Sequence, residues 1–229
     1  MDLQQRCELL QRLYRIHDGF ISGIRRACRE HCAACCTCNV TGTTLEGWWL
    51  LEQLRGAGTD LAAFAQKLSS MARPQRFNPQ TTINEMAGLC VQGRELPEEH
   101  NDPAAGSCPM LEGDLCPIYE IRPFGCRAML STQDCTGAEE ARMPPLVLSA
   151  NHVVMQYIEA LDRPGASGNM IDILLFLSDP ARRRAYENRM RHQWPRPLRP
   201  NRPIPALLIP PEHRKAVQPL LETLSMCSR

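Results

Sequence analysis

Twelve cysteines in a chain of 229 residues constrain its fold and chemistry more than any other feature of the sequence. Eight of them form two groups: Cys28, Cys32, Cys35 and Cys36 in the first, and Cys108, Cys116, Cys126 and Cys135 in the second. A chain of this length can bury a hydrophobic core, so it does not need disulfides to hold its fold together. Where thiols stay reduced, crowded cysteines usually serve metal or redox chemistry. The two groups therefore predict a metal site.

The rest of the composition is that of an ordinary globular protein. The first residues are polar and lack the pattern of a secretory signal, and no apolar run approaches the roughly 18 to 20 residues that span a bilayer. We therefore expect a cytoplasmic protein with no membrane partner. The net charge of +1 argues against nucleic acid as a partner, and the arginines between residues 182 and 202 are interpreted as a solvated face. A protein partner of unknown identity is expected, and the oligomeric state stays open.

Apolar periodicity and capping signals predict a mainly helical chain. An amphipathic helix is expected from Asp2 into the first cysteine group. The capping box Thr43-Thr44-Leu45-Glu46 starts a second helix, and Asp60 caps a third. Seven prolines between residues 194 and 211 predict an extended surface segment. Further helices are expected over residues 83–90, 145–162, 169–177, 179–192 and from 212 onward.

The first cysteine group, if helical, places Cys28, Cys32 and Cys35 on one face with Cys36 at its edge. Cys28 and Cys36 would then lie roughly 12 Å apart along the helix axis. Thiolates around one zinc ion lie only about 4 Å apart. Either the helix breaks near Cys35 or the four thiols do not share one ion, and further ligands should come from elsewhere. His31 would point away from this face.

The second cysteine group can supply those ligands. Two short extended pieces over 108–111 and 115–119 flank Glu112-Gly113-Asp114, which predicts a hairpin turn. Cys108 and Cys116 on either side of this turn are typical of the knuckles that present metal ligands. Prolines fix the backbone beside the cysteines: Pro109, Pro117 and Pro123.

In combination, Cys-x3-Cys-x2-Cys-Cys and the run Cys-Pro-x-Leu…Cys-x-Ile-Tyr-x-x-Arg-Pro-x-x-Cys-Arg…Cys resemble the YkgJ family of cysteine-cluster proteins. The resemblance covers about residues 28 to 142 and implies a zinc- or iron-chelating domain with eight characteristic cysteines. A related domain occurs in flagellin lysine methylases, where an iron–sulfur cluster is implicated. The resemblance therefore favours a 4Fe–4S cluster, with zinc as the alternative. The shared motif also includes Tyr119, Arg122, Pro123 and Arg127.

Three functions stay open at this point. The first is a protein that holds an iron–sulfur cluster for redox, metal handling or a partner-directed role. The second is a structural zinc-binding interaction module, and the third is a cluster-dependent methyl- or radical-transfer enzyme related to flagellin lysine methylase. Arg122 and Arg127 are expected beside the sulfurs, where guanidinium groups would offset a site charge of about −2. Tyr119 is expected to pack or to donate a hydrogen bond.

Four cysteines lie outside the family motif. Cys7, Cys90 and Cys227 each stand alone on a helical pattern and are interpreted as packing residues. Cys38, two residues past Cys36, stays open as a further ligand. The spacing of the first three cysteines also matches that of radical S-adenosylmethionine enzymes, but the strands of their barrel are missing from the sequence pattern.

The predicted fold is therefore mainly α: an irregular helical domain with a short β-hairpin or knuckle region organised around a cysteine-ligated metal site. Four units are expected along the chain. They are an N-terminal amphipathic helix over 1–27, the cysteine-cluster metal-binding domain over 28–142, a helical extension over 143–193, and a Pro-rich surface segment with a terminal helix over 194–229.

Overall fold

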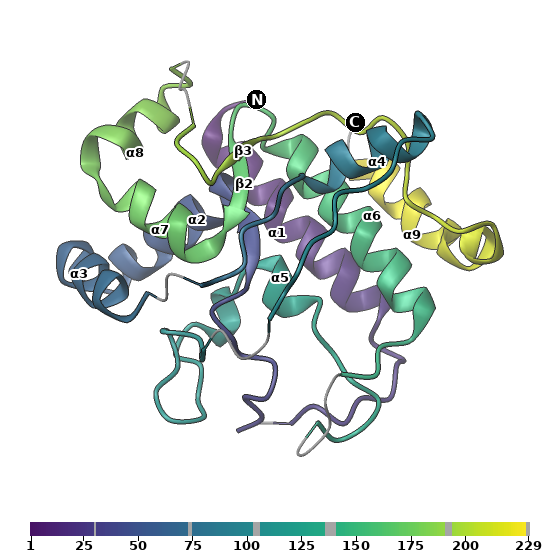
Figure 1. The fold of residues 1–229 in the computed structure, drawn as a ribbon, viewed down its shortest axis with the longest axis horizontal. Helices are drawn as coiled ribbons and strands as arrows, with labels where there is room; N and C mark the ends of the chain where they lie inside the picture. The colour runs from purple at the N-terminus through teal and green to yellow at the C-terminus, as the bar shows by residue number, and fades with distance from the viewer. Residues whose placement is uncertain (30, 73–74, 103–105, 136–140, 191–193, 228–229) are drawn as a thin grey trace.

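The computed structural model describes residues 1–29, 31–72, 75–102, 106–135, 141–190 and 194–227. The fold is mainly α, as predicted, and a small antiparallel sheet joins its parts (Figure 1). The helices are α1 (Leu3–Phe20), α2 (Thr44–Gly56), α3 (Leu61–Met71), α4 (Ile83–Val91), α5 (Phe124–Arg127), α6 (Pro145–Leu161), α7 (Met170–Ser178), α8 (Pro180–Glu187) and α9 (Arg214–Cys227). Two 3-10 turns, η2 (Tyr119–Ile121) and η3 (Pro211–His213), add to them. Across the described ranges, no helix is long and apolar enough to cross a membrane.

The two larger hydrophobic clusters are built from different sets of helices. The first is built mainly by α1, α6 and α9, with Leu45 of α2 and Phe124 of α5. The second joins α2, α3, α7 and α8 around Leu50, Leu174 and Leu177. Figure 1 shows the corresponding arrangement, with α2, α3, α7 and α8 on one side, α4, α6 and α9 on the other, and α1 and α5 between them.

Three short strands form the sheet, in the order β1 (Thr41–Thr43), β2 (Ala166–Asn169) and β3 (Arg199–Pro200). β1 pairs antiparallel with β2, with Gly42 opposite Gly168, and β2 pairs antiparallel with β3. This sheet was not predicted. Its strands are too short and too rich in Gly, Ser, Thr and Pro to show the alternation of apolar and polar residues by which a strand is recognised.

The helix starts follow the capping signals. The Thr43 hydroxyl accepts a hydrogen bond from the Glu46 backbone N–H, and the Glu46 carboxylate accepts one from the Thr43 backbone N–H. These two bonds confirm the predicted capping box. Asp60 caps α3, and Asp179 caps α8 with Pro180 in the first turn. These helices therefore begin where the sequence predicted them.

The prediction that the first helix continues into the cysteines is wrong. α1 ends at Phe20, with Ile21 as its C-cap, and the described residues from there to Val40 form turns and irregular backbone rather than a helix. His31 has a φ of 63°, a left-handed conformation that an α-helix excludes. The cysteines of the first group therefore do not share a helix face. The apolar periodicity that ends near Ile24 had indicated that the helix stops before them.

Two further expectations need correction. The extended pieces around 108–111 and 115–119 are not strands: one isolated bridge joins Glu112 to Leu115, and the second piece passes into turn η2. The turn itself is present, because Gly113 adopts a φ of 66° that favours glycine. α8 ends at Glu187 rather than near residue 192, since Asn188 caps it and Arg189 takes a φ of 51°.

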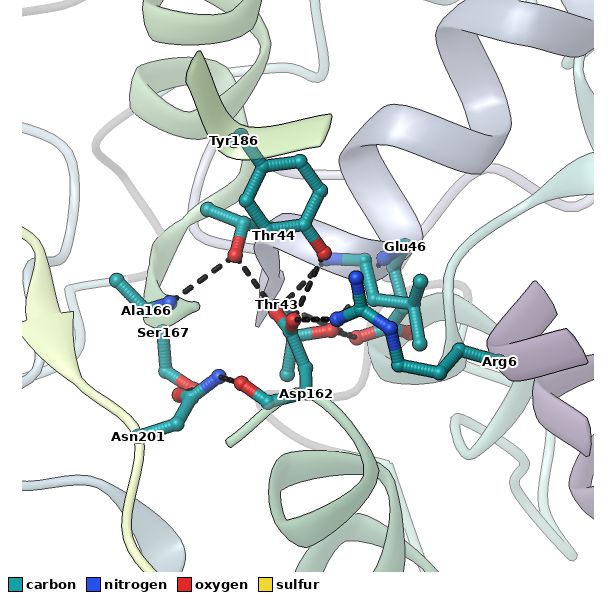
Figure 2. A network of polar contacts seen from close by, with 10 residues as sticks. Arg6, Thr43, Thr44, Glu46, Asp162, Ala166, Ser167, Tyr186 and Asn201 are labelled. Carbon is teal, nitrogen blue, oxygen red and sulfur yellow. Dashed lines mark hydrogen bonds and ion pairs between the residues drawn. The ribbon is translucent and has the colours of Figure 1, made fainter. Parts of the chain in front are cut away.

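A buried polar network connects the helices of the two hydrophobic clusters (Figure 2). Asp162, fully buried at the end of α6, accepts hydrogen bonds from the Thr44 hydroxyl at 2.6 Å, the Tyr186 hydroxyl at 2.7 Å and the Leu45 backbone N–H at 2.9 Å. Arg6 of α1 forms an ion pair with the same carboxylate at 3.2 Å. Burial raises the pKa of Asp162 to about 6, which the hydrogen bonds and Arg6 oppose. One carboxylate thus joins α1, α2, α6 and α8.

Candidate metal centre

The cysteine-bearing segments gather at one end of the molecule. In Figure 1 they are the dark-blue loop that follows α1 and the teal loops on either side of α5, all at the bottom of the view. Each described cysteine side chain is a free thiol. These loops contact one another in two places, and the eight predicted ligands accordingly lie in two groups.

A short backbone pairing brings Cys36 and Cys108 together. Thr37 and Ser107 form an antiparallel bridge, flanked by hydrogen bonds from the Cys108 N–H to the Cys36 carbonyl and from the Cys38 N–H to the Gly106 carbonyl, both at 2.9 Å. These segments lie about seventy residues apart and carry no strand signal in the sequence, so their pairing was not predicted. It places one cysteine of each predicted group side by side.

Around this pairing, the thiols of Cys36, Cys108, Cys116 and Cys126 interact electrostatically with one another. A hydrogen bond from Cys35 lowers the pKa of Cys36, while burial and the nearby thiols of Cys108, Cys126 and Cys116 oppose that shift. Burial, followed by the nearby thiols of Cys108 and Cys116, raises the pKa of Cys126 to about 12. Thiolates packed this closely repel one another, so a cation is needed before all of them can ionise together.

Cys35 lies beside this group. Its thiol donates a hydrogen bond to Cys36, which raises the pKa of Cys35 and lowers that of Cys36. Cys35 also acts on Cys126 and is approached by Arg122. Five thiols therefore lie together in the structure, and we call them the Cys36 group: Cys35, Cys36, Cys108, Cys116 and Cys126.

The loop from Cys108 to Cys116 has the donors of a metal-binding knuckle. The backbone N–H groups of Met110 and Leu111 donate toward the Cys108 sulfur and act to lower its pKa, although burial has the larger, opposite effect. The Glu112–Leu115 turn then reverses the chain so that Cys116 returns to the same side. Backbone N–H donors of this kind stabilise a thiolate and fix its orientation.

The motif arginines differ in their contacts. Arg122 acts on Cys126 and Cys35, where its charge favours the thiolate, and its guanidinium lies over the Tyr119 ring at 3.6 Å. Tyr119 is itself 57% exposed, so it covers Arg122 rather than a buried core. Arg127 donates to the Arg122 carbonyl at 3.1 Å and pairs with Asp18 at 3.3 Å. It thereby fastens the Tyr119–Arg127 segment to α1.

The three remaining predicted ligands form a separate group. Cys28, Cys32 and Cys135 line a small cavity of about 100 Å³ together with His31. Cys28 accepts a hydrogen bond from the Ser131 N–H at 3.3 Å, which holds the loop before Cys135 against the first cysteine loop. His31 reaches Asp114 at 2.9 Å, on the Cys108–Cys116 loop, and is more than half exposed. We call Cys28, Cys32 and Cys135 the Cys28 group.

The cysteines outside the motif are packed or exposed individually. Cys7 is 2% exposed in the first hydrophobic cluster, and burial raises its pKa to about 12. Cys90 is exposed on α4, which lies at the other end of the molecule from the cysteine loops in Figure 1. Cys38 is buried and lines a cavity with Cys108 and Cys126, so it lies at the edge of the Cys36 group. The Cys227 side chain lies outside the described residues.

One carboxylate that the sequence assigned only to a helix cap also positions the site. Glu46, 2% exposed, accepts hydrogen bonds from the Phe124 backbone N–H at 2.7 Å and the Tyr14 hydroxyl at 2.8 Å. Gly125, next in the chain, lies so close to β1 that a Cβ would come within 2.6 Å of the Thr41 carbonyl oxygen. These contacts fix the short helix α5 that carries Cys126.

The donor chemistry fits a soft metal centre, but the side chains are not gathered around a point. Throughout the ranges that the structure describes, no three Cys, His, Asp or Glu side chains could hold a metal ion as they lie. The Cys36 group instead offers several half-buried sulfurs, backbone N–H donors and one guanidinium. Such a set suits a cluster several ångströms across better than one tetrahedral ion.

Comparison of the chain with family models, with curated proteins and with solved structures finds no match. The resemblance to the YkgJ family therefore stays a prediction based on the cysteine motifs quoted above.

Proposed function

We propose that this chain is a metal-binding protein in which the Cys36 group holds a 4Fe–4S cluster, for redox or metal handling. Cys36, Cys108, Cys116 and Cys126 would be the four ligands, with Cys35 as a neighbouring thiol. The observation that carries the proposal is the meeting of these segments: the 2.9 Å hydrogen bond between Cys108 and Cys36 joins them, and Cys126 lines a cavity with Cys108. A 4Fe–4S cluster needs four thiolates.

The surroundings of these ligands support a charged cluster. A bound cluster would supply one-electron redox chemistry, and the chain's own groups would set its electrostatics. Arg122 brings a positive charge to Cys126 and Cys35. Met110 and Leu111 offer N–H donors to Cys108. Such contacts stabilise thiolates and tune a redox potential. Cysteine-ligated clusters of this kind require reduced thiols, so we propose a reducing compartment such as the cytoplasm.

A structural zinc module is the second candidate. The Cys108–Cys116 loop favours it, because a turn with backbone N–H donors aimed at the first cysteine is typical of zinc knuckles. Zinc would use the same thiols but would carry no inorganic sulfide. The two functions therefore share their ligand residues and differ in the bound inorganic group, which is iron with sulfide in one case and zinc alone in the other.

The test is metal and acid-labile sulfide analysis of matched variants purified without oxygen. Cys126→Ser should lose nearly all bound metal, because it removes a ligand from the centre of the Cys36 group. Cys90→Ser should retain the wild-type content, since this exposed thiol on α4 belongs to neither group. Equal losses in the two variants would contradict the ligand assignment.

A further inference from the structure

A cavity of about 220 Å³ lies beside the cysteine site but belongs to neither cysteine group. Its walls come from β1, β2, α4, α6, the start of α5 and the segment around Phe77. An engineered apolar cavity of about 150 Å³ accepts benzene. The present cavity therefore has room for an apolar body of roughly ten non-hydrogen atoms. Apolar side chains make up much of its lining: Phe77, Ile83, Met86, Phe124, Met155 and Ile158.

The charged residues that line this cavity all carry carboxylates. They are Glu46, Glu159 and Glu99, and the lining contains no Lys, Arg or His. Glu46 and Glu159 are 2% and 1% exposed. Buried carboxylates are normally paired with a cation, yet across the described residues neither forms an ion pair. The cavity wall therefore carries negative charge that its own residues leave uncompensated.

Neutral groups supply the hydrogen bonds of these two carboxylates. Glu46 accepts from the backbone and side chain of Thr43 and from Tyr14 and Phe124. Glu159 accepts from the backbone N–H groups of Asn84 and Arg202 at 2.8 and 2.6 Å. Burial raises the pKa of both carboxyls, because these neutral donors only partly offset their removal from water. A cation in the cavity would restore the missing compensation.

Glu99 marks the mouth of the cavity. It is exposed, whereas the opposite wall is built of buried residues such as Phe124 and Ile158. Its carboxylate is held in place by the backbone N–H groups of Gln80 at 2.7 Å and Thr81 at 3.3 Å. A fixed negative charge at the entrance attracts a cationic ligand and repels an anionic one.

The cavity shares a wall with the Cys36 group. Phe124 and Gly125 line the cavity, while Pro123 and Cys126 of the same segment line the space that Cys38 and Cys108 face. In the same way, Thr41 lines the cavity, whereas its neighbour Val40 lines the space that Cys38 and Cys108 face. A ligand in the cavity would therefore contact the same two chain segments that line the space beside the thiols.

From these observations we infer that the cavity binds a small organic cation: a protonated amine on an apolar body of about ten non-hydrogen atoms. The apolar walls would bury the body, and Glu46, Glu159 and Glu99 supply the opposite charge. The site goes beyond the proposed cluster and does not depend on it, because none of its lining residues is a cysteine.

Three probes of nearly equal size test this inference: benzylamine, benzyl alcohol and benzoate, titrated into the full chain and followed by NMR shifts or calorimetry. Benzylamine should bind with a dissociation constant on the order of 1 mM, the range expected for so few atoms. Benzyl alcohol should bind roughly tenfold more weakly, since it lacks the charge. Benzoate should not bind.

Two variants locate the binding. Met86→Trp fills the cavity from α4 and should abolish benzylamine binding, whereas Met71→Trp, on an exposed position of α3 outside the lining, should leave it unchanged. Glu159→Gln should weaken binding about tenfold, and the exposed Glu99→Gln provides a second charge variant that leaves the buried network intact. The inference is overturned if no probe binds, if benzoate binds as well as benzylamine, or if Met86→Trp binds like the wild type.

Discussion

Asp162 illustrates how much stability one buried residue can control. Four donors converge on its carboxylate, from Arg6, Thr44, Leu45 and Tyr186. Asp162→Ala would leave all four buried without an acceptor, and Arg6 already has two nitrogens, Nε and Nη2, with no hydrogen-bond partner in the described structure. Removing one partner of a buried ion pair costs roughly 3–5 kcal/mol, so we expect a loss of that size in the free energy of unfolding measured with urea.

The control for this prediction is an exposed acid. Asp114 forms an ion pair with His31, and both side chains are more than half exposed. Asp114→Ala should leave the unfolding midpoint close to that of the wild type, because water replaces the lost contact. A similar destabilisation in both variants would mean that the buried network has no special role.

His17 predicts a dependence of stability on pH. It is fully buried, its Nε2 lies 2.7 Å from the Asn151 Oδ1, and burial lowers its pKa below the model-peptide value of 6.5. The folded state therefore binds a proton less readily than the unfolded state. The stability that neutral His17 contributes is present in full above pH 6.5 and is lost as the pH falls below it.

Urea unfolding of the wild type and of His17→Gln over a range of pH checks this expectation. The stability advantage of the wild type should shrink as the pH falls below 6.5. His100→Gln, at an exposed position, should show no such trend. A difference between wild type and His17→Gln that stays constant with pH would refute the assignment of His17 as a buried neutral group.

At the scale of single elements, helix starts and most helix ends were predictable, whereas the ends of α1 and α8 and the strands were not. Thr43, Asp60 and Asp179 act through their nearest neighbours in sequence, so their caps can be recognised without a structure. The end of α1 at Phe20 was missed although the apolar periodicity stops near Ile24. The pairing of β1 with β2 joins segments far apart in the sequence, which contains no local signal for it.

The Gly113 turn gives a prediction at this scale. Its φ of 66° is unfavourable for any residue with a Cβ. Gly113→Ala should cost about 1 kcal/mol in stability, and by loosening the Cys108–Cys116 loop it should speed the loss of metal to a chelator. Gly56→Ala is the matched control, because an added Cβ meets nothing within 4 Å at either position but Gly56 lacks the positive φ. Equal rates of metal loss in the two variants would show that the turn does not hold the ligands.

For the molecule as a whole, the sequence spacing does not show how the eight motif cysteines divide in space. The sequence gathers them into two groups, Cys28 to Cys36 and Cys108 to Cys135, whereas the structure brings Cys36 next to Cys108 and places Cys135 with Cys28 and Cys32. Each group thus mixes both sequence clusters. The cause is the position of Thr41–Thr43 and α5, which are fixed by Glu46 and by the packing of Gly125 against β1. These contacts are long-range and leave no mark in the local sequence.

The central claim is that the Cys36 group binds a 4Fe–4S cluster. The most direct measurement is the content of iron, acid-labile sulfide and zinc in wild-type protein purified anaerobically. The proposal predicts a brown protein with roughly four iron and four sulfide per chain and little zinc. A colourless protein with stoichiometric zinc and no acid-labile sulfide would contradict it.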